Sequence, residues 1–90
     1  MHNLGSYLSR NNKKLELLTT KEAANMLGIS TRTLANYRFN GTLSMDIHWF
    51  RINSRVVRFN KILLEHWILN RSNEDIHWKY VEKFYAKLPN

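Results

Sequence analysis

Residues 18–38, LTTKEAANMLGISTRTLANYR, constrain the fold more than any other part of the chain. Thr19 and Glu22 have the spacing of a capping box, in which the hydroxyl and the carboxylate each accept a backbone N–H at a helix start. The helix that begins there is predicted to end at Gly28, because glycine readily adopts the left-handed conformation of a helix C-terminus. The segment therefore predicts two short helices joined by a tight glycine turn.

The second helix of this pair is predicted to begin at a cap formed by Ser30 or Thr31 and to end at Gly41. Leu34 and Tyr37 are spaced so that they share the inner face of the helix. The small alanines of the first helix would let the second helix cross close to it. This arrangement is the sequence pattern of a helix-turn-helix.

The outer face of the second helix has side chains suited to DNA. Arginine pairs with guanine and asparagine with adenine in a major groove, and serine and threonine contact either. We predict that Arg32, Thr33 and Asn36 read base edges, whereas Arg38, near the helix end, holds a phosphate. The full set of predicted contacts is Ser30, Thr31, Arg32, Thr33, Asn36 and Arg38. The alternative is that some of these residues only cap or solvate the helix.

A β-hairpin is predicted over residues 50–59, where apolar and basic residues alternate on both sides of Asn53-Ser54. With a two-residue loop, one face would carry the core residues Phe50, Ile52, Val57 and Phe59. The other face would carry Arg51 and Arg58. We expect Arg55 at the tip to enter a minor groove, and Arg51 and Arg58 to contact the flanking DNA backbone.

Two helices are predicted after the hairpin. The first runs from Lys61 to about Arg71 with Asn60 as its cap, and Ile62 and Leu69 widen its apolar arc. The second covers residues 73–88 and begins at a capping box formed by Ser72 and Asp75. Its apolar stripe either folds back onto the preceding helix or pairs with a partner chain. The stripe consists of Ile76, Tyr80, Phe84 and Leu88.

Positive charge is concentrated around the predicted helix-turn-helix and hairpin. The chain has 90 residues and a net charge of +7, and residues 30–61 contain six basic side chains against one acidic side chain. This balance favours a nucleic acid partner. Residues 1–14 form a predicted flexible arm with a basic end, which is either a further DNA contact or a disordered terminus.

Several other functions are not expected from the sequence. There is no cysteine, and the four histidines lack the spacing of paired metal ligands, so we expect no metal site and no cofactor. No nucleophile–base motif or phosphate-binding glycine loop is present, which predicts a protein that is not an enzyme. No signal peptide or membrane span is recognisable, and we expect a cytoplasmic protein.

The order of these elements resembles the excisionase and MerR-like group of small winged helix-turn-helix DNA-binding domains. The matching residues are Leu18–Ala24, Leu27–Ser30, Thr33, Leu34, Tyr37, Arg38, Gly41, Leu43, the hairpin 51–59, Leu64, Trp67 and Ile68. The resemblance implies a mainly α fold with a small β-hairpin wing and an additional C-terminal helix. We divide the chain into the arm 1–14, the DNA-binding domain 15–71 and the amphipathic helix 72–90.

The resemblance also implies sequence-specific binding to double-stranded DNA. Within this group we favour an excisionase-like recombination directionality factor of a mobile element or phage, which bends DNA and directs a partner integrase. One alternative is a small transcriptional regulator of a prophage or mobile element. Another is a protein-interaction module that acts through the last helix. A homodimer and a cooperative array on DNA both remain open.

Overall fold

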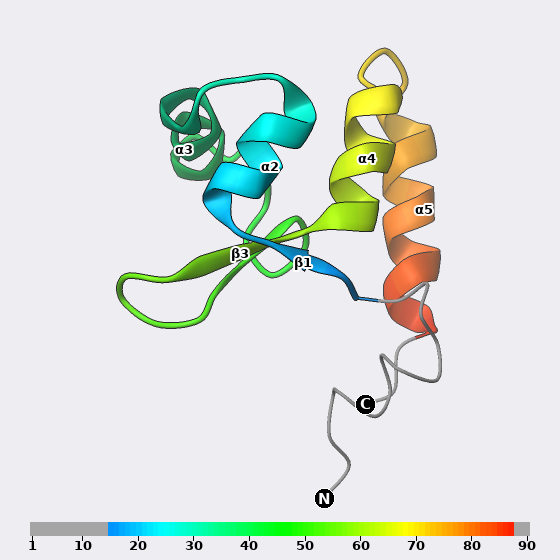
Figure 1. Ribbon diagram of the computed structural model, residues 1–90. Helices are drawn as coiled ribbons and strands as arrows, with labels where there is room; N and C mark the ends of the chain where they lie inside the picture. The colour runs from blue at the N-terminus through cyan, green and yellow to red at the C-terminus, as the bar shows by residue number, and fades with distance from the viewer. Residues whose placement is uncertain (1–14, 88–90) are drawn as a thin grey trace, which may run out of the picture.

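The computed structural model describes residues 15–87, so the predicted basic arm 1–14 and Leu88 lie outside the described residues. Figure 1 shows α2 and α3 beside a small sheet, with α4 and α5 running side by side at the other end. The elements in chain order are β1 (Leu17–Leu18), α2 (Thr20–Leu27), α3 (Thr31–Phe39), β2 (Trp49–Arg51), β3 (Val57–Asn60), α4 (Lys61–Leu69) and α5 (Glu74–Ala86). The predicted mainly helical fold with a hairpin and a C-terminal helix is confirmed.

The predicted caps around α2 are present. The Thr19 amide donates to Glu22 Oε1 at 2.9 Å, and the Glu22 amide donates to Thr19 Oγ1 at 3.1 Å. Gly28 follows α2 with a φ of 70°, and the Ile29 amide donates to the Ala24 carbonyl at 3.0 Å. This left-handed residue turns the chain so that α3 can begin three residues later, at Thr31.

The sheet has three antiparallel strands in the order β1-β3-β2. The short strand β1 was not predicted, and it pairs with β3 through Leu17↔Asn60 and Leu18↔Phe59. This pairing places the start of the helix-turn-helix directly on the strand that leads into α4. The central strand β3 therefore joins the two parts of the molecule.

The hairpin was predicted correctly, but its register was wrong. Trp49 pairs with Phe59 and Arg51 pairs with Val57, so β2 turns its Trp49 face toward the core. The Ile52 amide donates to the Val56 carbonyl at 2.8 Å, which leaves a three-residue loop rather than the predicted two-residue loop at Asn53-Ser54. Because side chains alternate along a strand, this one-residue shift moves every side chain of β2 to the opposite face.

This shift corrects two predictions about the faces of the hairpin. Phe50 and Ile52 do not share the core face with Phe59; Phe50 pairs with Arg58 on the other face, and Ile52 is 56% exposed. Arg51 and Arg58 consequently lie on opposite faces instead of forming one basic surface. Trp49, which lies before the predicted hairpin, takes the core position next to Phe59.

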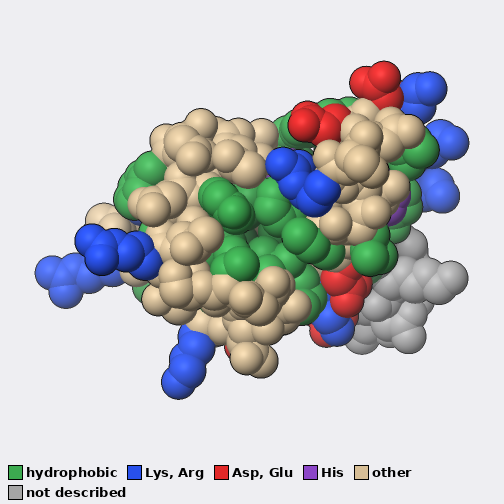
Figure 2. Space-filling model, turned by 90° about the horizontal axis from the view of Figure 1, so that it is seen from above, with side chains coloured by type: hydrophobic (Ala, Val, Ile, Leu, Met, Phe, Trp, Pro, Cys, Tyr) green, Lys and Arg blue, Asp and Glu red, His purple; other side chains and the backbone are tan. Residues whose placement is uncertain are grey.

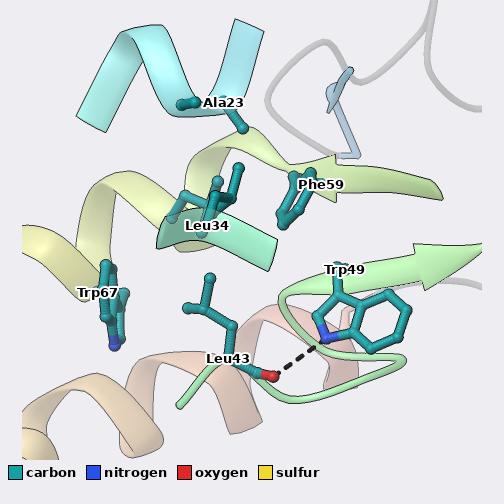
Figure 3. Packing of buried hydrophobic residues seen from close by; sticks show 8 residues of the cluster. Ala23, Leu34, Leu43, Trp49, Phe59 and Trp67 are labelled. Atoms are coloured by element: carbon teal, nitrogen blue, oxygen red, sulfur yellow. Dashed lines mark hydrogen bonds between the residues drawn. The ribbon is translucent and has the colours of Figure 1, made fainter. Parts of the chain in front are cut away.

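The main core lies where α2, α3, α4 and the sheet meet, as Figure 3 shows. Its buried residues are Ala23, Ala24, Leu34, Leu43, Trp49, Phe59, Leu64 and Trp67. The two alanines let α3 approach α2 closely, as predicted. The Trp49 indole is held in place because Nε1 donates to the Leu43 carbonyl at 3.0 Å.

A second cluster joins α4 to α5, and it corrects the predicted apolar stripe. The residues of α5 that are buried are His77, Val81 and Phe84. Phe84 therefore packs inside, while Ile76 and Tyr80 are 48% and 37% exposed. The sequence pattern chose the wrong face because a histidine, not an isoleucine, occupies the first buried position of the helix.

Two helix boundaries also differ from the sequence prediction. Asn73, rather than Ser72, caps α5, and its Oδ1 accepts from the Ile76 amide at 3.4 Å. Helix α4 ends at Leu69, before the predicted Arg71, and the Leu69 side chain is 81% exposed instead of widening the packed arc. A turn of a few residues therefore joins α4 to α5, and α5 folds back against α4.

Candidate nucleic-acid interface

The outer face of α3 carries the side chains that were predicted to read bases. Arg32 and Asn36 are both exposed and lie four residues apart, which places them on one side of the helix. Thr31 is exposed beside them, and Thr33 is half-buried. The structure thus leaves a guanidinium and a carboxamide free on the same helical face.

The Ser30 side chain caps α3, and its hydroxyl is used in hydrogen bonds within the helix start. Its Oγ accepts from the Thr33 amide at 3.0 Å and donates to Thr33 Oγ1 at 3.0 Å. The hydroxyl of Thr33 still has its own proton to donate. Of these two predicted contacts, Thr33 is therefore the one with hydrogen-bonding capacity to spare.

The end of α3 and the hairpin meet at the Trp49 ring. The guanidinium carbon of Arg38 lies 4.8 Å from the centre of this ring, and that of Arg51 lies 5.6 Å from it. Both distances are within the range of cation–π attraction. The Trp49 indole therefore contacts one guanidinium from α3 and one from β2.

Arg38 is half-buried, unlike the exposed Arg51 beside it. Its Nε and Nη1 are shielded from solvent and have no hydrogen-bond partner, and its guanidinium also lies 4.9 Å from the Phe39 ring centre. Burial, followed by the charge of Arg51, lowers the pKa of Arg38 below its ordinary value. An anion placed beside these two like charges would relieve their repulsion.

The wing tip is ordered by the Asn53 side chain. Asn53 Oδ1 accepts from the amides of Arg55 and Val56 at 2.9 and 3.0 Å, and the Arg55 side chain is exposed. Arg58 lies on the opposite face from Arg51, where its Nη1 donates to the Val57 carbonyl at 2.8 Å. The structure therefore brings Arg38 and Arg51 together but does not place Arg58 with them.

Charge is distributed unevenly over the molecule. In Figure 2, Lys and Arg side chains project from the end where α3 and the hairpin lie, whereas acidic and basic side chains are mixed at the end formed by α4 and α5. Only cations extend outward at the first end in this view. A polyanion would meet the α3 end with less repulsion.

Sequence reasoning missed two aromatic residues of this surface. Trp49 is the ring under both arginines, and Phe39 is 75% exposed at the end of α3 beside Arg38. The spacing of Trp49 and Arg51 along one strand could have indicated their shared face. The contact with Arg38 depends on the loop between α3 and β2, and it had no signal in the sequence.

These features define a class of protein. Two helices joined by a tight turn, with a basic hairpin beside the second helix, form a winged helix-turn-helix. The chain belongs to the helix-turn-helix domain family, whose sequence profile matches residues 17–72. This membership supports DNA binding, and DNA-binding proteins of this family are typically not enzymes. Neither the curated proteins nor the solved structures gave a match to the chain.

Among residues 15–87, no helix is long and apolar enough to cross a membrane. Within the same residues, no group of three or more His, Asp and Glu side chains is arranged to hold a metal ion.

Proposed function

We propose that the protein binds double-stranded DNA sequence-specifically, with α3 in the major groove and the β2–β3 hairpin as a wing beside it. The observation that carries the proposal is the convergence of Arg38 and Arg51 on Trp49. This contact ties the position of the hairpin to the end of α3. A helix and a wing fixed in this way can follow one DNA backbone while the outer face of α3 meets the bases.

Each predicted contact has a distinct role in this proposal. Arg32, Thr33 and Asn36 contact base edges, where a bidentate pair discriminates by about 1–3 kcal/mol. Arg38 and Arg51 hold phosphates, and Arg55 enters a minor groove. Thr31 donates to the backbone at the start of α3, and Ser30 acts through the cap. Arg58 has the weakest geometric support.

The test uses a labelled duplex selected from a random pool by the full-length protein, and an unselected duplex for comparison. Arg32→Ala together with Asn36→Ala should reduce the preference for the selected duplex by about 30-fold or more, because each of the two lost base contacts costs about 1–3 kcal/mol. Affinity for the unselected duplex should change much less. Equal loss on both duplexes would contradict base reading by α3.

A matched pair of wing variants tests the phosphate contacts. Arg51→Ala should weaken binding to both duplexes and lower the slope of log affinity against log salt by about 0.9, as expected for one phosphate lost. Arg58→Ala removes the same charge from the opposite face and should leave that slope nearly unchanged. A larger effect from Arg58→Ala would reverse the assigned orientation of the wing.

We further propose an excisionase-like role, in which the protein bends DNA at repeated sites and directs a partner integrase of a mobile element toward excision. The support is the resemblance carried by residues 17–69 and membership of a helix-turn-helix family. Footprinting on the DNA that flanks the gene should then reveal repeated sites, and gel mobility should reveal bending. A single palindrome bound by a stable dimer would instead favour the transcriptional regulator.

A further inference from the structure

Three histidines from separate parts of the chain form a continuous row between the DNA-binding domain and α5. His48 Nε2 lies 2.8 Å from His77 Nε2, and His66 Nδ1 lies 2.9 Å from His77 Nδ1. His48 belongs to the loop between α3 and β2, His66 to α4 and His77 to α5. Since the two neighbours use opposite edges of His77, the rings form a line and do not converge on one point.

A single backbone amide sets the tautomer of the whole row. The Ser44 amide donates to His48 Nδ1 at 2.9 Å, so that nitrogen has no proton. His48 must then donate from Nε2 to His77 Nε2, and His77 must donate from Nδ1 to His66 Nδ1. Every bond in the row is satisfied only while all three rings are neutral. An added proton on any ring places two N–H groups face to face.

The surroundings disfavour that added proton. His48 is fully buried and His77 is 2% exposed, and burial, followed by the charge of a neighbouring histidine and of Arg71, lowers the pKa of each to about 4. Burial also lowers the pKa of His66. Glu74 is the acidic side chain that lines the same hollow as His48, His77 and Arg71. Lys79 and Lys83 line the hollow beside His66, and the Tyr80 ring stacks on His66 at 4.0 Å.

The row holds the loop that sets the position of the wing. Besides the Ser44–His48 bond, Tyr85 of α5 donates to the Ile47 carbonyl at 2.6 Å. The Asn60 amide donates to the His48 carbonyl at 2.9 Å, which fixes the same loop to the end of β3. Trp49, the ring under Arg38 and Arg51, is the next residue. A shift of His48 therefore acts on the residue that aligns the two arginines.

We propose that His48, His77 and His66 form a proton-sensitive latch through which α5 holds the loop before β2, and that protonating the latch releases the wing and weakens DNA binding. The proposal rests on the proposed DNA-binding function for its effect on affinity. The latch itself is a property of the free protein. The side chains assigned to DNA are arginines, threonines, a serine and an asparagine, and none of them is a histidine or a carboxylate.

The sign of the pH effect separates the latch from simple electrostatics. Added protons make the protein more positive, which by itself strengthens binding to a polyanion on acidification. The latch predicts the opposite, because each histidine released from the row shifts the balance toward the open loop by up to about tenfold per pH unit. Affinity for the selected duplex should fall at least about tenfold between pH 7.5 and pH 5. Constant or rising affinity would overturn the proposal.

Two variants of residues that hold the same loop provide the controls. His77→Gln removes the central titrating ring, and its affinity should be lower at pH 7.5 and should fall less on acidification than that of the wild type. Tyr85→Phe removes the anchor to Ile47 without removing a histidine, and it should keep the pH dependence of the wild type. An unchanged pH dependence in His77→Gln would overturn the proposal.

A measurement on the wild-type protein without DNA keeps the latch testable if His77→Gln does not fold or if no duplex is bound. Long-range ¹H–¹⁵N spectra at pH 7 should show the proton of His48 on Nε2 and that of His77 on Nδ1. On acidification, the Ser44 amide and the Trp49 indole N–H should shift together with the histidines. The opposite tautomers, or independent shifts, would overturn the latch. Absence of duplex binding at pH 7.5 with the expected tautomers would instead overturn only the proposed function.

Discussion

The two ends of the molecule differ in the ionisable side chains that set their character: arginines are exposed at one end, and histidines are buried at the other. At the α3 end, Arg32, Arg51 and Arg55 are exposed and charged. At the α5 end, His48 and His77 are buried and kept neutral. Exposed charges remain hydrated until a partner replaces the water, whereas a buried ring must stay uncharged to keep its hydrogen bonds. One end thus presents cations to the solvent, and at the other end burial keeps the histidines uncharged.

The largest expected effect comes from the core strand that joins these two ends. Phe59→Ala should lower the free energy of unfolding by about 3–5 kcal/mol, because the ring is fully buried and its loss leaves a cavity. Urea unfolding measures this loss. Phe50→Ala, on the opposite face of the hairpin, should cost only about 1 kcal/mol. Equal losses would support the two-residue loop and contradict the observed register.

The next largest effect is on the pH dependence of the free energy of unfolding, which the buried histidines of the α5 end should produce. The pKa values of His48 and His77 are lowered to about 4 from 6.5, so the unfolded chain binds more protons between these values. Their contribution to stability is complete above about pH 6.5 and is lost as the pH falls toward 4. Each histidine adds a slope of up to about 1.4 kcal/mol per pH unit.

Urea unfolding at a series of pH values measures this slope. Readings between about pH 5 and pH 6.5 are the most useful because most carboxylates remain ionised there. A flat profile would mean that the histidines are already accessible in the folded protein.

The smallest expected effect is the loss of stability when the helix cap at either end of the molecule is removed. Ser30→Ala should lower the free energy of unfolding by about 1 kcal/mol, because the Thr33 amide loses a 3.0 Å hydrogen bond. Asn73→Ala should cost less, since its bond to the Ile76 amide is 3.4 Å long. Thermal unfolding of the two variants checks the order. A larger loss from Asn73→Ala would show that α5, not α3, depends more on its cap.

Local signals predicted the helix-turn-helix well. The Thr19–Glu22 capping box, the Gly28 turn and the α3 cap each depend on residues at most a few positions apart. The hairpin was found for the same reason. The register of the hairpin was not predicted correctly, because the alternation of apolar and basic residues fits two loop lengths. Only the packing of Trp49 on the core selects one of these lengths.

The candidate DNA-binding surface was predicted in part. Exposure of Arg32 and Asn36 follows from helical spacing, so the residues for the outer face of α3 could be chosen from the sequence. The aromatic partner of Arg38 could not be predicted from the sequence, since Trp49 is eleven residues away across an irregular loop. The face of α5 was misassigned because apolar spacing cannot reveal that the buried His77 has hydrogen-bond partners on α4 and on the loop before β2.

The sequence by itself determined the helices, their caps, the glycine turn and the concentration of cations around α3 and the wing, because these depend on short-range spacing and composition. Only the tertiary structure decided which side chains of β2 face inward, which face of α5 packs, and that His48, His66 and His77 meet. Those outcomes depend on contacts between residues far apart in the chain. Burial and hydrogen bonding at such contacts, rather than local preference, select the arrangement.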